Sequence, residues 1–178
     1  MLTKSAETII HTYIDDDFSI WYYGDKELTP DIANSLLQPL QTRFCDEFID
    51  FLCSPLNGMK IEAREQVWPR PEIYADGPKW SFQYGLSVFG IGDRVPAWMH
   101  LIEATEQFRN GTGLFAVPFM SILGDQDEYC FVESGEIVKY DKDTGTLLAV
   151  NNSFNSILEK ELKELQERKE RIKRSSPY

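Results

Sequence analysis

The fold is decided by residues 117–158, which read VPFMSILGDQDEYCFVESGEIVKYDKDTGTLLAVNNSFNSIL. Short apolar runs rich in Val, Ile, Phe and Tyr alternate here with turn segments that contain Gly and Asp. The runs are Val117–Leu123, Tyr129–Val132, Ile137–Tyr140 and Leu147–Val150. Runs of this length and composition between such turns predict an antiparallel meander, in which each strand pairs with the next.

A helix is expected directly after the last run. Asn151, Asn152 and Ser153 are residue types that cap helices, and Phe154 begins an amphipathic segment. A meander that passes into a helix, with no crossover helices between its strands, is typical of an α+β fold. We therefore expect a single domain with a mostly antiparallel sheet, helices packed on it and a C-terminal helix.

Length and charge limit the class of protein. The chain has 178 residues, of which 42% are hydrophobic, enough to build one core. Its formal net charge of -11 would be repelled by nucleic-acid phosphates and by anionic membranes, so we expect neither as a partner. Two explanations of the charge stay open: solubility, which most acidic proteins share, and a basic macromolecular partner.

The compartment is also indicated by the sequence. Cys45, Cys53 and Cys130 form no C-x-x-C pair, which predicts reduced, buried thiols. The N-terminal segment has no signal-peptide pattern, and no apolar run is long enough to cross a bilayer. We expect a cytoplasmic protein.

Helices and strands are expected before the meander as well. Helical patterns begin at Ala6, at Pro30 behind the capping Thr29, at Pro39 and at Pro96, and Phe18–Tyr23 is an expected strand. The strongest strand pattern covers Trp80–Phe89, where large residues alternate with small or polar ones; the large residues are Trp80, Phe82, Tyr84, Leu86 and Val88. We interpret this face as core packing, with an aromatic ligand groove as the alternative.

The C-terminal helix carries acid-to-base pairs four residues apart, from Glu159 and Lys163 to Glu170 and Arg174. Its apolar stripe is thin and is broken at Lys169. We therefore expect a domain over residues 1–165 and a charged helical tail over residues 166–178 that projects from it.

One segment imitates a catalytic motif. Asp141 and Asp143 follow an apolar strand, as the nucleophile and the acid–base aspartate of haloacid-dehalogenase-type phosphatases do. Thr144 puts the following Gly and Thr out of register, and too little chain follows to complete a parallel sheet. We interpret the segment as a hairpin turn with Gly145 at positive φ, and keep a hydrolase as an alternative.

Two further acidic segments are weak metal motifs. Asp125, Asp127 and Glu128 resemble the start of a Ca²⁺ loop but lack its glycine and its distal glutamate. Three consecutive aspartates, Asp15–Asp17, indicate a solvated turn rather than a metal site, because adjacent side chains on a loop diverge. We expect no catalytic residues, no metal and no cofactor.

Several segments, taken in order, resemble the SUKH superfamily, the Smi/Knr-type domains. They are a helix before an Asn-Gly turn, the meander and the start of the last helix; the residues are Phe48–Leu52 with Asn57 and Gly58, then Pro118–Ile122, Asp125–Phe131 and Gly135–Asp141, then Ser153, Phe154, Ile157 and Leu158. Trp80–Gly90 is similar to a segment of bacterial members. The resemblance extends from Leu36 to Leu162.

This resemblance implies an α+β fold without a catalytic site. Most bacterial members are immunity proteins that bind and block a cognate toxin, often a nuclease, in the cytosol, and an acidic inhibitor suits a cleft built for phosphate. The implied partner is therefore a basic protein toxin. Fungal relatives are regulatory scaffolds, which makes a cytosolic scaffold or protein-interaction module without a toxin the alternative.

We expect the partner to bind acidic turns at one end of the meander. Alternate turns of a meander lie at the same end, so the turn with Asp125, Asp127 and Glu128 should lie beside the turn with Asp141 and Asp143. Five carboxylates on one rim suit electrostatic steering of a basic partner, although exposed turns favour Asp for their own geometry.

Overall fold

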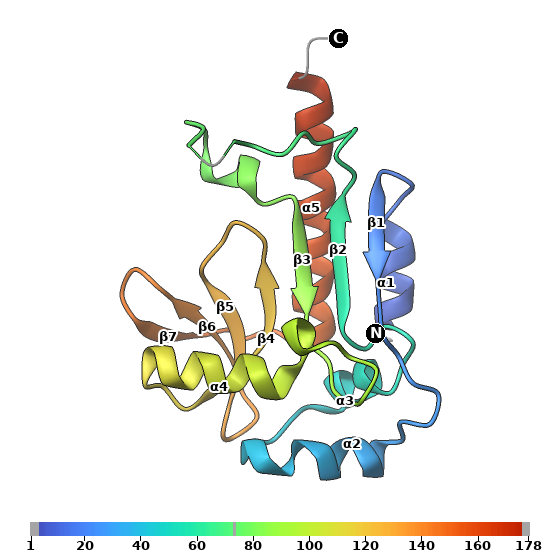
Figure 1. Ribbon diagram of the computed structural model, residues 1–178, viewed down its shortest axis with the longest axis vertical. Coiled ribbons are helices and arrows are strands. Elements are labelled where there is room, and N and C mark those ends of the chain that lie inside the picture. Colours follow the sequence, from blue (N-terminus) through green and yellow to red (C-terminus); the bar gives the residue numbers. More distant parts are fainter. Residues whose placement is uncertain (1–3, 73, 176–178) are drawn as a thin grey trace.

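The computed structural model describes residues 4–72 and 74–175 (Figure 1). Within them, seven strands form one sheet whose order in space follows the sequence, and each neighbouring pair is antiparallel. The strands are β1 (Phe18–Trp21), β2 (Met59–Ala63), β3 (Gly85–Val88), β4 (Ala116–Ile122), β5 (Glu128–Val132), β6 (Ile137–Asp141) and β7 (Thr146–Ala149). The predictions of an α+β fold and of a four-stranded meander are confirmed.

Helices flank this sheet on both faces. They are α1 (Ala6–Tyr13), α2 (Pro30–Leu37), α3 (Asp46–Leu52), α4 (Leu101–Thr112) and α5 (Phe154–Ser175), with short 3-10 helices η1 (Gln38–Leu40), η2 (Lys79–Phe82) and η3 (Ala97–Met99). In Figure 1, α1 and α5 lie behind the sheet and α4 crosses in front of β4 and β5. The expected caps are present: the Thr29 hydroxyl accepts the Ile32 N–H ahead of Pro30, and the Ser153 hydroxyl accepts the Ser156 N–H.

An aromatic cluster centred on Phe48 of α3 buries the helix-covered face. Its ring centroid lies 5.7 Å from that of Phe119 on β4, 5.1 Å from Phe131 on β5 and 5.3 Å from Phe154 on α5. All four side chains are fully buried. Because side chains alternate along a strand, this cluster determines which residues of β4 and β5 point to the opposite face.

The opposite face is covered only in part. Phe108 of α4 packs on Ala116, Cys130 and Val138 of β4, β5 and β6. Elsewhere on this face, direct cross-strand partners form one row over strands β1 to β6. The row consists of Trp21, Lys60, Ser87, Ser121, Glu128 and Tyr140. We call these six residues the polar row.

The expected strand over Trp80–Phe89 is wrong in its first half. Lys79–Phe82 is a 3-10 helix, and the strand is limited to Gly85–Val88. The Ser81 hydroxyl donates to the Pro78 carbonyl, and the Ser81 carbonyl accepts the indole N–H of the buried Trp68. These contacts hold a turn where the alternating pattern alone predicts a strand.

Two expected helices begin later than their prolines suggest. Around Pro39 the chain makes only the short η1, which is followed by Gln41 with a φ of 52°, and α3 begins at Asp46. After Pro96 it makes η3, and α4 begins at Leu101. The cysteines are free thiols, of which Cys130 is buried while Cys45 and Cys53 are partly exposed.

The expectation that the C-terminal helix projects beyond Leu165 is wrong. Helix α5 is continuous to Ser175, and Lys169 has no exposed side-chain surface. Its ammonium lies 2.7 Å from Asp15 Oδ2, 2.9 Å from Asp17 Oδ2 and 2.9 Å from Glu170 Oε1. The residue that breaks the apolar stripe is thus the centre of an ion cluster, and Asp15 and Asp17 do not form a merely solvated turn.

Other contacts keep this end of α5 on the domain. Arg168 donates to the Gln83 carbonyl at 3.1 Å, and the Arg171 guanidinium lies 4.1 Å from the centre of the Trp80 ring. Burial acts to lower the pKa of Lys169, but its hydrogen bonds to the three carboxylates outweigh burial and raise that pKa above its ordinary value. The ammonium is therefore charged at neutral pH.

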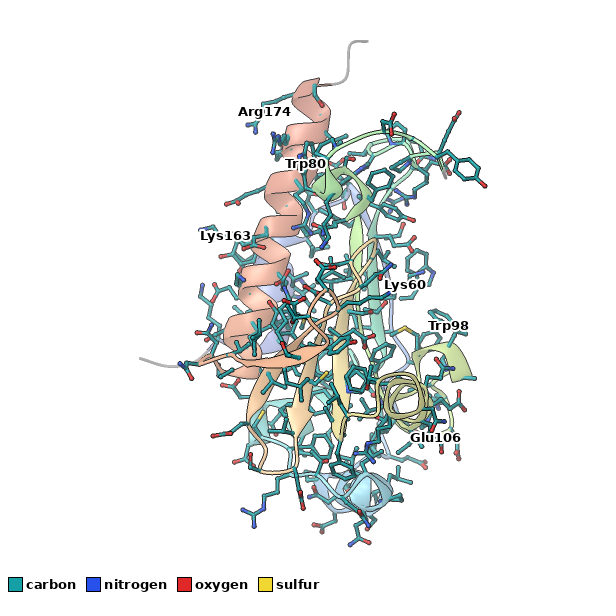
Figure 2. All side chains as sticks on the ribbon, turned by 90° about the vertical axis from the view of Figure 1, so that its left-hand side faces the viewer. Lys60, Trp80, Trp98, Glu106, Lys163 and Arg174 are labelled. Carbon is teal, nitrogen blue, oxygen red and sulfur yellow. The ribbon has the colours of Figure 1, made fainter. Side chains whose placement is uncertain are left out.

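The change Lys169→Met should lower the free energy of unfolding by about 2–3 kcal/mol, because it leaves three carboxylates without their shared cation. The loss should be smaller than for a fully buried ion pair, since all three carboxylates are partly exposed. Urea unfolding measures it. Lys163→Met, at an exposed position of the same helix (Figure 2), is the matched control and should change stability little. Equal stability of the two variants would contradict this assignment.

Candidate binding groove

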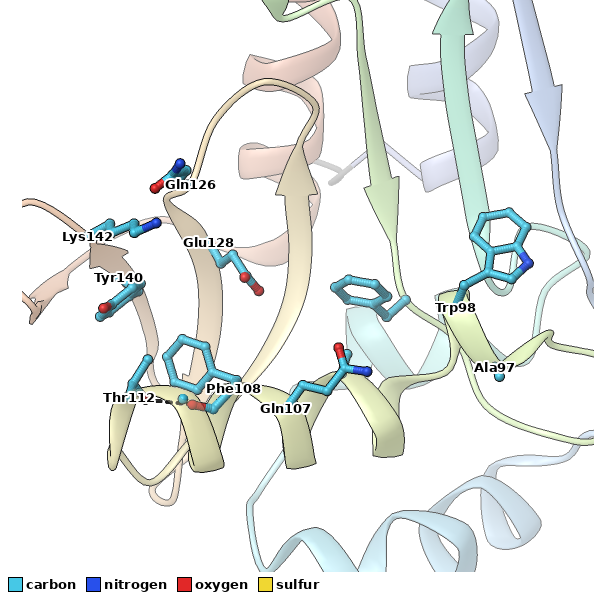
Figure 3. A pocket seen from close by; sticks show the side chains of 12 residues that line it. Ala97, Trp98, Gln107, Phe108, Thr112, Gln126, Glu128, Tyr140 and Lys142 are labelled. Carbon is cyan, nitrogen blue, oxygen red and sulfur yellow. Dashed lines mark hydrogen bonds between the residues drawn. The ribbon is translucent and has the colours of Figure 1, made fainter. Parts of the chain in front are cut away.

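A groove lies on the partly covered sheet face, between α4 and the β5–β6 hairpin (Figure 3). Its volume is about 530 Å³. Strand residues and helix residues face each other across it; those used below are Glu128 and Tyr140 from the sheet, Gln107 and Phe108 from α4, Trp98 at one end and Lys142 at the other.

The local sequence fixes the walls of the groove. Glu128 opens β5 and is paired with Tyr140 across the ladder, so both side chains point to the same face. The Phe108 ring meets Tyr140 edge to face, with centroids 5.1 Å apart and an interplanar angle of 85°. This pair makes a fixed aromatic corner beside Glu128.

Glu128 is partly buried in this groove, and its carboxylate points into the space above α4 (Figure 3). Among the described residues, no group donates a hydrogen bond to that carboxylate and no cation lies within ion-pair distance of it. Burial raises the pKa of Glu128 to about 7. Burial thus favours the protonated form of this carboxyl, and a cation that entered the groove would favour its charged form.

An exposed aromatic surface adjoins the groove at Trp98. The Lys60 ammonium lies 5.8 Å from the Trp21 ring centre and 5.5 Å from that of Trp98, and 2.6 Å from Glu62 Oε1. Trp21 is 42% exposed and Trp98 58%. Figure 2 shows Lys60 and Trp98 on one side of the molecule, away from Lys163 and Arg174 of α5. We call Trp21, Lys60 and Trp98 the aromatic platform.

The two acidic turns lie together, as the meander predicts. Asp127 Oδ1 accepts the backbone N–H of Lys142 at 3.0 Å and so joins the β4–β5 turn to the β6–β7 turn. Gly145 has a φ of 66°, and its N–H donates to the Asp141 carbonyl, which confirms the interpretation of this segment as a hairpin turn.

The five predicted rim carboxylates differ in what surrounds them. Asp125 lies 3.1 Å from the Lys79 ammonium; burial acts to raise its pKa, but the Asp127 N–H and Lys79 outweigh burial and lower it. Asp141 accepts the N–H groups of Asp143 and Thr144, at 2.9 and 3.3 Å, which is a turn-forming role. Asp143 is exposed, whereas Glu128 faces the groove and not the rim.

Sequence reasoning missed the helix wall of the groove, because the position of α4 across the strands depends on contacts far apart in the sequence. A signal for Glu128 was present. It lies on the same face of β5 as Cys130 and Val132, which pack under α4. A charged residue in line with two core residues indicates a site rather than a solvated turn.

A second acidic cluster has the spacing of a cation site. Oxygen atoms of Asp15, Asp17 and Glu170 lie within 4.8 Å of one another. The Lys169 ammonium contacts all three carboxylates. The chain therefore supplies its own cation there, in contrast to Glu128.

Comparisons with models of protein families, with curated proteins and with solved structures find no match. The resemblance to the SUKH superfamily therefore stays a prediction that rests on the residues named for it. Within residues 4–72 and 74–175, no helix has the length and apolar character needed to span a membrane.

The raised pKa of Glu128 predicts a pH-dependent stability. The folded state holds this proton more tightly than the unfolded state, so the free energy of unfolding falls as the pH rises from 4.5 through about 7. Glu128→Gln removes this loss. The variant should match the wild type at pH 4.5 and exceed it at pH 8, by at most about 3 kcal/mol.

Urea unfolding at the two pH values measures this difference. Glu133→Gln, at an exposed position just after β5, is the matched control and should follow the wild type at both. A Glu128→Gln variant with the wild-type pH dependence would show that the Glu128 carboxyl is not held in an unfavourable environment.

Proposed function

We propose that this protein is a cytoplasmic immunity protein that binds and neutralises a basic protein toxin without catalysis. The observation that carries the proposal is Glu128, a carboxylate kept without a cation in an open groove with aromatic walls. A charged group that destabilises the folded state is typical of functional sites, where a bound ligand provides the missing partner charge. The resemblance to SUKH immunity proteins supports the same class.

The surroundings of the groove suit a protein partner. Tryptophan is enriched among the residues that anchor protein interfaces, and the aromatic platform exposes two tryptophans with the Lys60 ammonium over both rings. The chain has 29 acidic against 18 basic residues, and Asp127 and Asp143 lie at the end of the sheet next to Lys142. Such a field speeds the approach of a basic partner.

Reactive side chains in and near the groove support binding rather than catalysis, because each is engaged in a structural hydrogen bond. The Thr112 hydroxyl donates to the Phe108 carbonyl at 2.7 Å, so it is engaged within α4 rather than paired with a base. His100 caps α4, since its Nδ1 accepts the Ile102 N–H at 3.3 Å. For the hydrolase alternative, Asp141 is a poor nucleophile because its carboxylate holds the hairpin turn.

Growth protection tests this function. The protein should restore growth to a bacterial host that expresses the toxin encoded by the gene next to its own, and a pull-down should recover the pair. Trp98→Ala and Glu128→Lys should each abolish protection, because one removes an anchor and the other opposes a basic partner. Glu133→Lys, the matched charge reversal outside the groove, should protect like the wild type.

Thermal unfolding of each variant excludes loss of the fold as the cause. A wild-type protein that neither protects nor binds would reject the immunity function. Recovery of the toxin without protection would favour the scaffold alternative, in which the same surface holds a partner but leaves its activity intact.

A further inference from the structure

The geometry points to a subsite in the groove that takes one guanidinium group, bound to the Glu128 carboxylate and stacked on the Phe108–Tyr140 corner. This inference rests on the proposed function in one respect: it assigns the guanidinium to an arginine side chain of the toxin. A free small guanidinium compound would share the chemistry, so the test below separates the two sources.

The same sheet face already holds one guanidinium beside a carboxylate and a tyrosine ring. Glu62 and Lys60 alternate with the core residue Ile61 on β2, so Glu62 shares the face of the polar row. Arg70 Nη2 lies 3.8 Å from Glu62 Oε2, and its guanidinium lies 4.0 Å from the centre of the Tyr84 ring. There the guanidinium donates to the carbonyls of Trp68 and Ala63, at 2.9 and 2.6 Å, and lies beside a carboxylate and over a tyrosine ring. The Glu62 carboxylate also pairs with Lys60 at 2.6 Å.

Glu128 and Tyr140 repeat that carboxylate and ring without the cation. The two residues are direct partners across the β5–β6 ladder, and the Phe108 ring closes the corner from α4. A cation over an aromatic face is attracted by the ring, and more strongly where water is excluded. The groove that buries Glu128 is thus lined by rings suited to bind a cation that would neutralise it.

No described residue places a cation in the subsite. Of the 12 residues that line the groove, Lys142 alone carries a positive charge. Lys142 is exposed at the rim, and its ammonium is not within ion-pair distance of Glu128. An incoming guanidinium therefore has to compete only with an exposed lysine and with water for the carboxylate.

The shape of the ligand follows from the walls. A guanidinium is planar, stacks on aromatic rings and donates two parallel hydrogen bonds to one carboxylate, whereas an ammonium is a compact and strongly hydrated charge. Gln107 rises from α4 toward the groove, so its amide oxygen can accept a further N–H (Figure 3). The subsite should therefore prefer guanidinium to alkylammonium.

NMR titration of the ¹⁵N-labelled protein tests the subsite without any toxin. Methylguanidinium should shift the amide signals of Gln107, Phe108, Glu128 and Tyr140 in a saturable way, with a dissociation constant in the millimolar range expected for a ligand of so few atoms. Butylammonium should bind at least threefold more weakly, and neutral methylurea should cause no saturable shift.

Glu128→Gln should weaken methylguanidinium binding at least tenfold, while Glu133→Gln should leave it unchanged. Binding should also strengthen several-fold from pH 6 to pH 8, as Glu128 loses its proton. The other titratable groups near Glu128 are Tyr140 and Lys142 on the β6 side and Cys130, two residues along β5 on the same face. Helix α4 contributes no titratable group to the groove lining. Shifts that do not saturate, or that survive Glu128→Gln, would overturn the subsite.

Binding of a short arginine peptide distinguishes an arginine side chain from a free guanidinium compound as the ligand. Acetyl-Gly-Arg-Gly-amide should bind more tightly than methylguanidinium if the groove accepts an arginine within a polypeptide. Tighter binding of the free cation would instead reject the toxin side chain as its ligand.

The outcomes for the subsite and for the immunity function are separable. Saturable, Glu128-dependent binding together with failed protection would keep the subsite and reject the immunity function. Protection that survives Glu128→Gln, with no binding of methylguanidinium, would keep the function and reject the subsite.

Discussion

The structure depends on the contact of Phe48 with Phe119, Phe131 and Phe154, which joins α3, β4, β5 and α5 in one buried cluster. Since strand side chains alternate, burying Phe131 turns Glu128, Cys130 and Val132 to the other face of β5. Helix α4 covers Cys130 through Phe108 but does not cover Glu128. The aromatic cluster determines which residues lie on the other face of the sheet. The groove forms there because α4 covers only part of that face.

The parts of the fold that local chemistry determines could be predicted from the sequence. Turn residues marked the meander, and Thr29 and Ser153 marked helix starts, because each acts on neighbours in the chain. Features that depend on distant partners were missed. The Trp68 indole bonds to Ser81, 13 residues along the chain, and Lys169 pairs with Asp15 across a sequence separation of 154 residues. The sequence predicted that the two acidic turns lie together, and Asp127 does join them. The groove could not be predicted, because it depends on the position of α4, which no local pattern encodes.

Two acidic sites in this chain differ in whether the chain supplies a cation, and this difference distinguishes a stabilising site from a candidate binding site. Asp15, Asp17 and Glu170 receive the Lys169 ammonium from the chain itself, which ties the end of α5 to the sheet. Glu128 receives no cation from the described residues and is left beside aromatic rings, where its charge disfavours the folded state. An acidic protein that leaves this carboxylate unpaired next to exposed tryptophans has the features expected of a surface that binds a basic protein.

The central claim is that Glu128 is an unpaired carboxylate held ready for a cation. The most direct measurement is the pH titration of its side-chain carboxyl ¹³C signal, without and with saturating methylguanidinium. Our account predicts a pKa of Glu128 near 7 in the free protein and a clearly lower pKa with the cation bound. A pKa of Glu128 at its ordinary value of 4.5 in the free protein, or one that the cation does not move, would contradict it.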